Sequence, residues 1–483
     1  MIRVNLDKLS QKLGKNISEI ARETGINRNT ITSLYHNKVD GIKFATLETL
    51  CQKYNLVLSD ILEYKEKDKQ EKSRGLYKQE GEIVPFTTWP PVLAVCRPNK
   101  KYFELDLKRL DIYYKKDYSY WYWDKSAMRE FARNVYKRFS SPQKFKPFFE
   151  DYLSYALVLE NYYFSHDEQD ILRFSEKEVL EFFEKMRRAY ADFWEISLFI
   201  DAFDEGFDHE EIKRIADKYN LSMDEVGILT SPVEMTFSNE RILELLRIAH
   251  KFKKTDLNKL GKIVREDLEI RKYIKKFDCY KSNYAYIDHI SYSELEEELK
   301  KYINDSQKLK LEMQRLENYL SGQEKRIDSV LKKHKLTVNP LFFFNRLTYW
   351  REIRKQTNLM GIHLLFAILK NISAKTGIDL KYISFISFDE VKNVLRGLIN
   401  KDILRQRMEK GLFVIMEKQG YKIYEGDEAN SLMNEAEKNL AQGQEKDIVF
   451  GQVASQGYAK GVARIILNLS DFGKFKEGEV LVT

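Results

Sequence analysis

The chain has 483 residues, 43% of them hydrophobic and 32% charged, with a formal net charge of +7. A chain of this length exceeds what one hydrophobic core normally serves, so we expect roughly two to four domains. The sequence has no run of about eighteen apolar residues and its charge is modest for its length, so we expect a cytoplasmic protein with no membrane partner.

The chain opens with a predicted helix over residues 4–13, where leucines recur at helical spacing. Residues 16–38 predict two further short helices around a tight turn. Ser18 is expected to cap the first of these helices, Gly25 to form the turn and Asn27 to cap the second. Two short helices joined in this way are typical of the helix-turn-helix, so DNA binding is the function predicted for this end.

The second helix of this pair separates two kinds of residue. Ile31 and Leu34 are expected to face inward, and the remaining polar side chains suit base edges and phosphate oxygens. Residues 1–45 also contain eight lysines and arginines against four acids. We expect double-stranded DNA as the partner, bound by a homodimer. The predicted contact residues are Ser18, Arg28, Asn29, Thr30, Thr32, Ser33, His36, Lys38 and Lys43.

Predicted helices over residues 45–54 and 58–62 complete a five-helix domain over residues 1–65. This domain resembles the Cro/repressor-like (XRE-type) helix-turn-helix family of bacteria in four phrases: Ser18–Ala21, Thr24–Ile31, Thr46–Cys51 and Asp60–Tyr64. The resemblance implies a head that recognises an operator. A single head has a small DNA interface, and a protein-binding helix-turn-helix is therefore an alternative interpretation.

The composition changes twice after the head. Residues 66–82 mix basic and acidic side chains and predict a charged linker. Residues 83–124 contain four prolines among β-favouring, aromatic-rich segments such as 91–95 and 110–114, and predict a cap with some strand. Residues 125–440 repeat apolar side chains three and four apart and predict a long helical region.

Part of the helical region, residues 299–330, nearly fits a heptad repeat that is broken at Ser306 and Gln323. Such a repeat can form a helical hairpin within one chain or the seam of a dimer. We favour the hairpin, since repeats of this kind occur more often inside a chain.

The last residues return to the period of a strand. Residues 447–453 and 461–469 predict two strands around a glycine-bearing turn, and Val480 begins another. The many small residues let the backbone approach another surface closely. This region resembles the opening of the mobile phosphohistidine domain of phosphoenolpyruvate-utilising enzymes. The residues of the matching motif are Gly451, Ser455, Gly457, Gly461 and Arg464.

The resemblance extends upstream to about residue 152, through phrases at 229–232, 349–354 and 383–390. It implies that 125–440 is similar to the helical region of phosphoenolpyruvate-synthase-like proteins. It also implies that residues 445–483 begin a β/β/α swivelling domain, which we expect to be truncated because the chain stops inside a strand. The phosphoryl-carrying histidine of that family lies downstream of this strand. A separate ATP- or phosphoenolpyruvate-binding protein is then the expected phosphoryl donor.

The rest of the sequence offers little further chemistry. It contains no phosphate-binding loop and no dinucleotide fingerprint, and its cysteines and histidines lack the spacing of metal ligands. We therefore expect no catalytic residue, no cofactor and no metal site in this chain. The aromatic segments Trp121–Trp123 and Tyr349–Trp350 could stack on bases, but packing in a core is the favoured interpretation.

Together these patterns predict a multidomain, mainly α protein. It has a five-helix Cro-like head, a long helical middle region and the start of a β/β/α swivelling domain. The predicted function is a sequence-specific DNA-binding transcriptional regulator coupled to a phosphoenolpyruvate-utilising-like module. The alternative is a phosphotransferase of the phosphoenolpyruvate-utilising family, whose catalytic histidine lies beyond residue 483.

Overall fold

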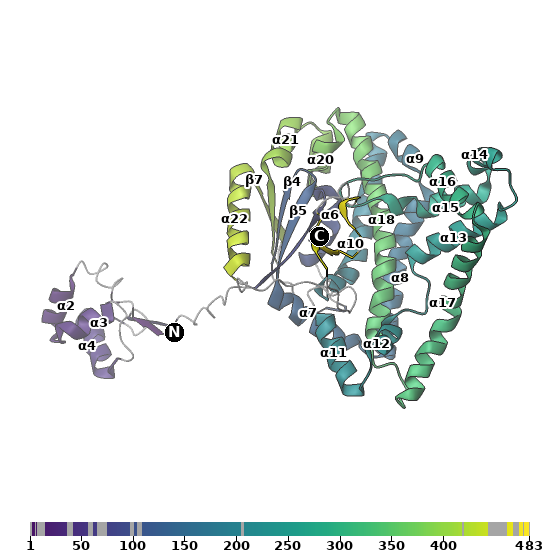
Figure 1. Cartoon of the computed structure of the whole chain (residues 1–483). Coiled ribbons are helices and arrows are strands. Elements are labelled where there is room, and N and C mark those ends of the chain that lie inside the picture. The colour runs from purple at the N-terminus through teal and green to yellow at the C-terminus, as the bar shows by residue number, and fades with distance from the viewer. Residues whose placement is uncertain are drawn as a thin grey trace. The chain divides into compact units, whose positions relative to one another are not determined.

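A computed structural model describes thirteen parts of the chain, and within them the protein is mainly helical, as predicted. The described residues are 2–4, 6, 15–35, 42–56, 61–64, 75–96, 101–103, 109–203, 207–417, 420–442, 461–466, 473–476 and 478–482. The chain divides into a unit of residues 1–443 and a unit of residues 444–483. Within the first unit, the head up to Tyr64 has a hydrophobic core of its own, so the head and the body from residue 75 are described separately (Figure 1).

The head contains three helices and a pair of strands in its described residues. These are β1 (Ile2–Val4), α2 (Ile17–Thr24), α3 (Arg28–Tyr35), α4 (Phe44–Tyr54) and β2 (Leu62–Tyr64). The core is formed by residues that lie three and four apart along the helices. They include Ile20, Ile31, Leu34, Leu47 and Leu50. The three central helices of the sequence prediction are therefore confirmed.

The two outer helices of the head are confirmed only in part: Leu6 and Ile61 are helical, whereas one end of each predicted helix is extended. Val4 lies in β1 and Leu62 in β2, and the two strands pair in antiparallel register. β-Branched side chains at Ile2 and Val4 favour this extended backbone, and the pairing satisfies backbone groups that a short helix would have satisfied within itself. The remaining residues of both predicted helices, 5, 7–13 and 58–60, lie outside the described residues.

The body is built on a five-stranded antiparallel sheet with the strand order β3-β5-β4-β6-β7. Its strands are β3 (Leu76–Glu82), β4 (Leu110–Lys115), β5 (Tyr118–Asp124), β6 (Leu412–Glu417) and β7 (Gly420–Glu425). Strand was expected at 110–114 and is confirmed. Residues 76–82 were assigned to a charged linker and 412–425 to the helical region, and both assignments are wrong. The strand β6 pairs with β4 about three hundred residues earlier in the chain, which no local pattern signals.

Two helices cover the two faces of this sheet (Figure 1). α22 (Gly426–Gln442) packs on the face that carries Tyr113 and Phe413, and α6 (Pro85–Cys96) packs on the face of Ile112 and Val414. Residues 91–95 were predicted to favour strand and lie in α6 instead. A helix that is apolar on all sides has no polar face, so its sequence shows no helical period.

The remaining helices lie beside the sheet. They are α7 (Lys125–Phe139), α8 (Pro142–Ser165), α9 (Glu168–Arg173), α10 (Glu176–Ser197), η1 (Leu198–Ala202), α11 (Phe207–Tyr219), α12 (Met223–Thr230), α13 (Phe237–Lys251), α14 (Leu257–Glu266), α15 (Leu268–Phe277), η2 (Asp278–Lys281), α16 (Tyr292–Ile303), α17 (Ser306–Lys333), α18 (Phe342–Thr376), α19 (Leu380–Ile383), η3 (Phe388–Glu390), α20 (Val391–Leu395) and α21 (Lys401–Lys410). Among the helices of the described residues, none is both long enough and apolar enough to cross a membrane.

Central among these helices is α18, a helix of 35 residues. It contacts α8, α9, α10, α12 and α13, and twenty of its residues are buried. Trp350 on this helix is fully buried, in contact with Phe148, Tyr152 and Phe199. The packing interpretation of this aromatic residue is therefore confirmed.

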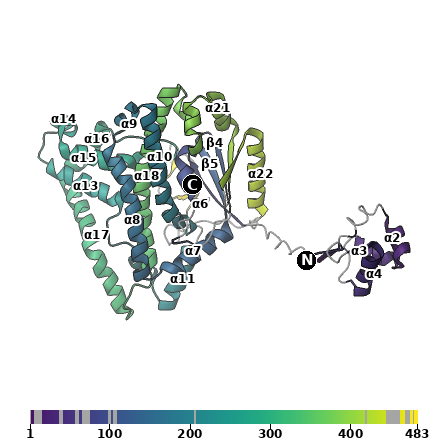
Figure 2. The ribbon, with the colours of Figure 1, turned by 180° about the vertical axis from the view of Figure 1, so that it is seen from behind.

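The heptad-like repeat of residues 299–330 spans two helices. α16 ends at Ile303, and Asp305 caps the start of α17 by accepting a hydrogen bond from the Lys308 backbone N–H at 2.9 Å. The two helices contact each other and both contact α13, so the intramolecular hairpin is confirmed. Figure 2 shows from behind that α17 lies at the edge of the body away from the sheet.

The second unit contains two short parallel strands, β8 (Ala463–Ile465) and β9 (Val480–Val482). They confirm parts of the strands predicted at 461–469 and from Val480, and residues 447–453 lie outside the described residues. A Cβ atom on Gly461 would stand 2.3 Å from the Gly478 carbonyl oxygen, so only glycine fits this backbone approach. Arg464 in β8 forms an ion pair with Glu479.

The packing of α18 on α10 predicts a strong preference for glycine at residue 361. A Cβ atom on Gly361 would lie 2.8 Å from the ring of the fully buried Tyr190, whose hydroxyl donates a hydrogen bond to the Asn358 carbonyl at 3.0 Å. Gly361→Ala should lower the free energy of unfolding by about 1–3 kcal/mol, because the pinned ring leaves no space. Urea denaturation followed by circular dichroism measures this change.

A matched control is Gly227→Ala on the exposed surface of α12, where an added Cβ meets no atom within 4 Å. This variant should be neutral or more stable by up to about 1 kcal/mol, because alanine is the better helix former. Equal stability of the two variants would contradict the packing argument.

Candidate DNA interface and a polar cluster in the body

The helix-turn-helix begins with a capped helix whose capping residue differs from the predicted one. Asn16 caps α2: its Oδ1 accepts hydrogen bonds from the backbone N–H groups of Ser18 at 3.0 Å and Glu19 at 3.1 Å. Glu19 completes the capping box by accepting from the Asn16 N–H at 2.8 Å. The predicted cap, Ser18, instead lies in the first turn with an exposed side chain, because asparagine two residues earlier already satisfies the free N–H groups.

The turn that follows α2 has the predicted chemistry. Gly25 has a φ angle of 70°, in the left-handed region that glycine adopts without strain. Asn27 then accepts a hydrogen bond on its Oδ1 from the Asn29 backbone N–H at 2.8 Å. Both predictions for this turn are confirmed, and together they fix the direction in which α3 leaves α2.

The helix α3 presents a polar surface on one side and an apolar one on the other. Ile31 and Leu34 are buried in the head core, whereas Arg28, Asn29 and Thr30 in the first turn are exposed. Exposed arginine, asparagine and threonine side chains at the start of a helix can donate to and accept from base edges and phosphates.

The other predicted contact residues are distributed around this surface. Thr32 and Ser33 are half-buried on α3, and the Thr32 hydroxyl donates to the Arg28 carbonyl at 2.8 Å. Ser18 on α2 and Lys43 before α4 are exposed. His36 and Lys38 lie outside the described residues.

One exposed residue of the head was not singled out from the sequence. Phe44, which begins α4 directly after Lys43, is 86% exposed. An aromatic side chain beside an exposed lysine can pack against a sugar or a partner surface. The signal available in the sequence was a large aromatic residue directly before the predicted helix of residues 45–54.

A hydrogen bond from Tyr54 to Glu23 joins α4 to α2, and Lys15 forms an ion pair with the same carboxylate. The Glu23 carboxylate on α2 accepts hydrogen bonds from Lys15 Nζ at 2.6 Å and from the Tyr54 hydroxyl on α4 at 3.0 Å. The Lys15 contact, supported by Tyr54, lowers the pKa of Glu23. Burial, together with the Glu23 charge, raises the pKa of Tyr54 to about 12. These contacts set the spacing of α2 and α4.

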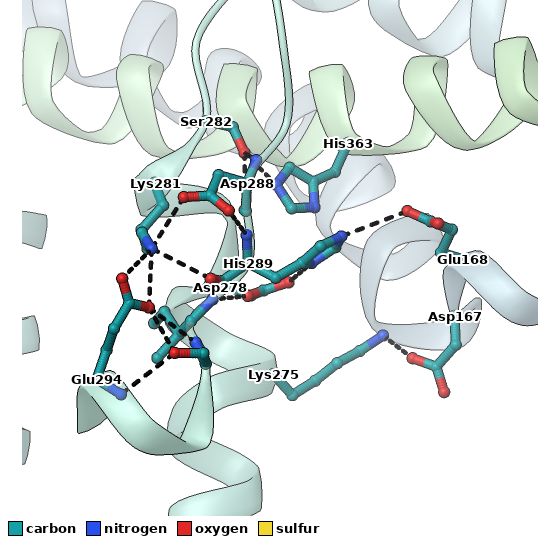
Figure 3. Close-up of polar contacts among 12 residues, drawn as sticks. Asp167, Glu168, Lys275, Asp278, Lys281, Ser282, Asp288, His289, Glu294 and His363 are labelled. Carbon is teal, nitrogen blue, oxygen red and sulfur yellow. Dashed lines mark hydrogen bonds and ion pairs between the residues drawn. The ribbon is translucent and has the colours of Figure 1, made fainter. Parts of the chain in front are cut away.

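A cluster of polar and titratable side chains lies in the body, around a cavity of about 380 Å³ (Figure 3). Its wall includes Asp278 from η2, His289 from the loop before α16, His363 from α18 and Glu168 from α9. Asp278 Oδ2 lies 2.6 Å from His289 Nδ1, and His289 Nε2 lies 3.6 Å from Glu168 Oε2. One ligand atom from each of Asp278, His289 and His363 lies within 4.8 Å of the others.

The polar groups of this cluster are neutralised by near neighbours. Burial lowers the pKa of His363 to about 4, so its imidazole is neutral at pH 7. Its Nε2 lies 2.5 Å from the Ser282 hydroxyl. Lys370 Nζ lies 2.8 Å from both oxygens of Glu168, and Lys275 pairs with Asp167. The cavity therefore combines carboxylate, imidazole and ammonium groups with little net charge.

The sequence prediction treated these histidines as scattered, because His289 and His363 are far apart in the chain. The fold brings them together, with ring centroids 5.6 Å apart. One signal was present: His363 is the single ionisable residue between Lys355 and Lys370, in the most apolar stretch of the chain. A lone histidine in such a stretch marks a buried polar site.

Two further sets of predicted residues have clear positions. Of the mobile-domain motif, Gly461 and Arg464 are described in the second unit, and Gly451, Ser455 and Gly457 lie outside the described residues. Trp121 and Trp123 are buried in β5, which confirms the packing interpretation and leaves these two rings inaccessible to bases.

Comparison with known proteins assigns the head. Residues 5–67 match the family model of the Cro/C1-type HTH DNA-binding domain. Searches of curated proteins and of solved structures find no match for the chain. The family match supports a DNA-binding regulator and covers none of the residues that resemble phosphoenolpyruvate-utilising enzymes, so that resemblance stays a prediction.

The capping geometry of α2 predicts that Asn16 stabilises the helix-turn-helix and that Ser18 does not. Asn16→Ala removes the acceptor for two N–H groups and should destabilise α2 by about 1 kcal/mol. Hydrogen exchange of the peptide that covers residues 17–24, measured in the whole chain, should then be about fivefold faster. Ser18→Ala is the matched control and should leave the exchange rate nearly unchanged. Faster exchange in Ser18→Ala than in Asn16→Ala would instead identify Ser18 as the cap.

Proposed function

We propose that this protein is a sequence-specific DNA-binding transcriptional regulator whose helix α3 enters the major groove. The observation that carries the proposal is the exposed first turn of α3, with Arg28, Asn29 and Thr30, inside a domain that matches the Cro/C1-type family. In helix-turn-helix proteins the second helix of the motif lies in the major groove, with its N-terminal residues at the base edges.

The side chains of this turn differ in what they can read. Arginine can donate two hydrogen bonds to guanine, and asparagine can pair with adenine through a donor and an acceptor. We therefore assign base recognition to Arg28 and Asn29. Ser18 and Lys43, which are exposed on the neighbouring elements, are assigned to the phosphate backbone, where contacts position the protein without reading sequence.

We further propose that the protein binds as a homodimer. One head of this size covers a small DNA surface, whereas two heads on half-sites about 34–36 Å apart supply the affinity that operators need. Phe44, 86% exposed beside Lys43, is available to such an interface.

The DNA proposal is tested by the double variant Arg28→Ala and Asn29→Ala in the whole chain. Binding to a fluorescent library of promoter-region DNA is measured against random DNA over a range of salt concentrations. The ratio of its affinity for the selected sites to its affinity for random DNA should fall at least about tenfold, because a good bidentate contact contributes roughly 1–3 kcal/mol of discrimination. Lys43→Ala should instead weaken binding to all DNA sequences alike and reduce the slope of log affinity against log salt concentration by about one.

Arg173→Ala is the control, since this arginine lies on α9 in the body and its side chain is 78% exposed. It should leave DNA affinity unchanged. Sequence preference that survives the double variant would overturn the assignment of α3. If the unaltered chain itself binds DNA weakly, without sequence preference and only at low salt, the result would favour a protein-binding head.

A second proposal concerns the residues after the body. We propose that they belong to a phosphohistidine-type module through which the regulator responds to phosphorylation, as the sequence resemblance implies. Two observations support this: β8 and β9 pair in parallel, and Gly461 of the motif meets Gly478 at a distance that permits no side chain. The Arg464–Glu479 ion pair fastens the same two strands.

This module predicts acid-labile, alkali-stable phosphate on a histidine of the complete gene product after incubation with labelled phosphoenolpyruvate or ATP and a partner kinase fraction. Gly461→Ala should reduce the labelling severalfold, because its Cβ would collide with the Gly478 carbonyl. Gly473→Ala is the matched control, with open space around the added Cβ. Complete gene product that stays unlabelled with both donors would contradict the module, and transfer onward to a small acceptor would favour the phosphotransferase alternative.

A further inference from the structure

The polar cluster of the body joins three separate elements at one cavity. We propose that Asp278, His289 and His363 form a binding site for a divalent transition-metal ion, with zinc as the chemically best-matched ion. Two imidazoles and one carboxylate are a common protein ligand set for zinc, and the same set also accepts cobalt, nickel and iron. This inference is independent of the proposed DNA binding, because it rests on residues of the body alone.

The distances require only a small rearrangement. Asp278 Oδ2 and His289 Nδ1 are 2.6 Å apart and now share a proton, and one ligand atom of each of the three residues lies within 4.8 Å of the others. Ligand atoms around a tetrahedral zinc ion stand about 3.3 Å apart, given metal–ligand bonds of about 2.0–2.2 Å. The ion would take the place of the shared proton, and the ligand atoms that are farthest apart would approach each other by at most about 1.5 Å.

The three ligand residues differ in how far their side chains can move. The His289 side chain is 49% exposed in the loop between η2 and α16, so its ring can turn. His363 is 8% exposed on the buried helix α18 and provides the fixed ligand. Asp278 is held by a hydrogen bond in which its Oδ1 accepts from the Ile290 backbone N–H at 2.7 Å.

The neighbours of the three ligands are those that metal sites use to orient histidines. A ligating imidazole usually donates its second N–H to a carboxylate or another acceptor, which fixes the tautomer. Glu168 Oε2 lies 3.6 Å from His289 Nε2, and the Ser282 hydroxyl lies at hydrogen-bonding distance from His363 Nε2. Both histidines would then bind the ion through Nδ1, with Nε2–H directed to these acceptors (Figure 3).

The cavity leaves space for a fourth ligand of the metal ion. Three protein ligands fill three of the four positions around zinc, and the fourth is then taken by water or by a small ligand. The adjoining space of about 380 Å³ has room for such a group, with Lys275 and Arg271 in its wall to attract an anion. An ordinary Asp278–His289 ion pair would account for two of the residues but not for the convergence of His363 on them.

The test uses the whole chain without an affinity tag, freed of metal by chelation and dialysis. Cobalt is added in steps, and its visible absorption reports tetrahedral coordination by nitrogen and oxygen. Zinc binding is followed by calorimetry on the same samples. We expect one equivalent of tightly bound metal in the unaltered protein, and a loss of affinity of at least about tenfold in Asp278→Asn and in His289→Ala.

The control is His250→Ala, which removes an exposed histidine at the end of α13 that is not part of the cluster. Its metal affinity should equal that of the unaltered chain. His363→Gln should abolish the cobalt absorption, and because His363 is buried, a circular dichroism spectrum identifies any loss of fold. The exposed His289 variant keeps the test decisive in that case. Metal binding that is equally tight in Asp278→Asn and His289→Ala, or an unaltered chain that binds no cobalt, would overturn the site.

Discussion

The burial of α18 is the constraint on which the rest of the body depends. A helix of 35 residues with twenty buried must be surrounded, and helices from both sides of it in the chain do so: α8, α9, α10, α12 and α13 before it, and α19 and α20 after it. One close approach, Gly361 against Tyr190, leaves no room for a methyl group. The same helix carries His363 into the polar cluster. The packing therefore determines where an uncommon buried imidazole is held, and the loop with His289 is placed around it.

The head depends on a different and more local set of forces. Its three helices share a small core, and caps and a single glycine turn fix their directions. The Glu23 contacts to Lys15 and Tyr54 then tie α2 to α4 across α3. Such a domain gains little from burial alone because it is small. Short-range hydrogen bonds therefore decide whether the first turn of α3 keeps the arrangement that the proposed base recognition requires.

The difference between these forces explains what could be predicted from the sequence. Gly25, Asn27 and the two faces of α3 follow from neighbours within a few residues, and these predictions are confirmed. The strand β6 needs a partner about three hundred residues away, and α6 lost its helical period because both of its sides are buried. The polar cluster was not predicted for the same reason, since His289 and His363 meet only after the helices have packed.

Separate cores in the head and the body also limit how a ligand of the body, such as the proposed metal ion, could act on the proposed DNA binding. A ligand bound in the body changes DNA affinity only by the difference in its own affinity for the DNA-bound and free states. The coupling is reciprocal, so operator DNA must change the affinity of the body for that ligand by the same factor. The cluster of Asp278, His289 and His363 joins η2, the loop before α16 and α18. A metal there would tighten these elements together, and any effect on α3 must appear equally in the metal affinity of the DNA-bound protein.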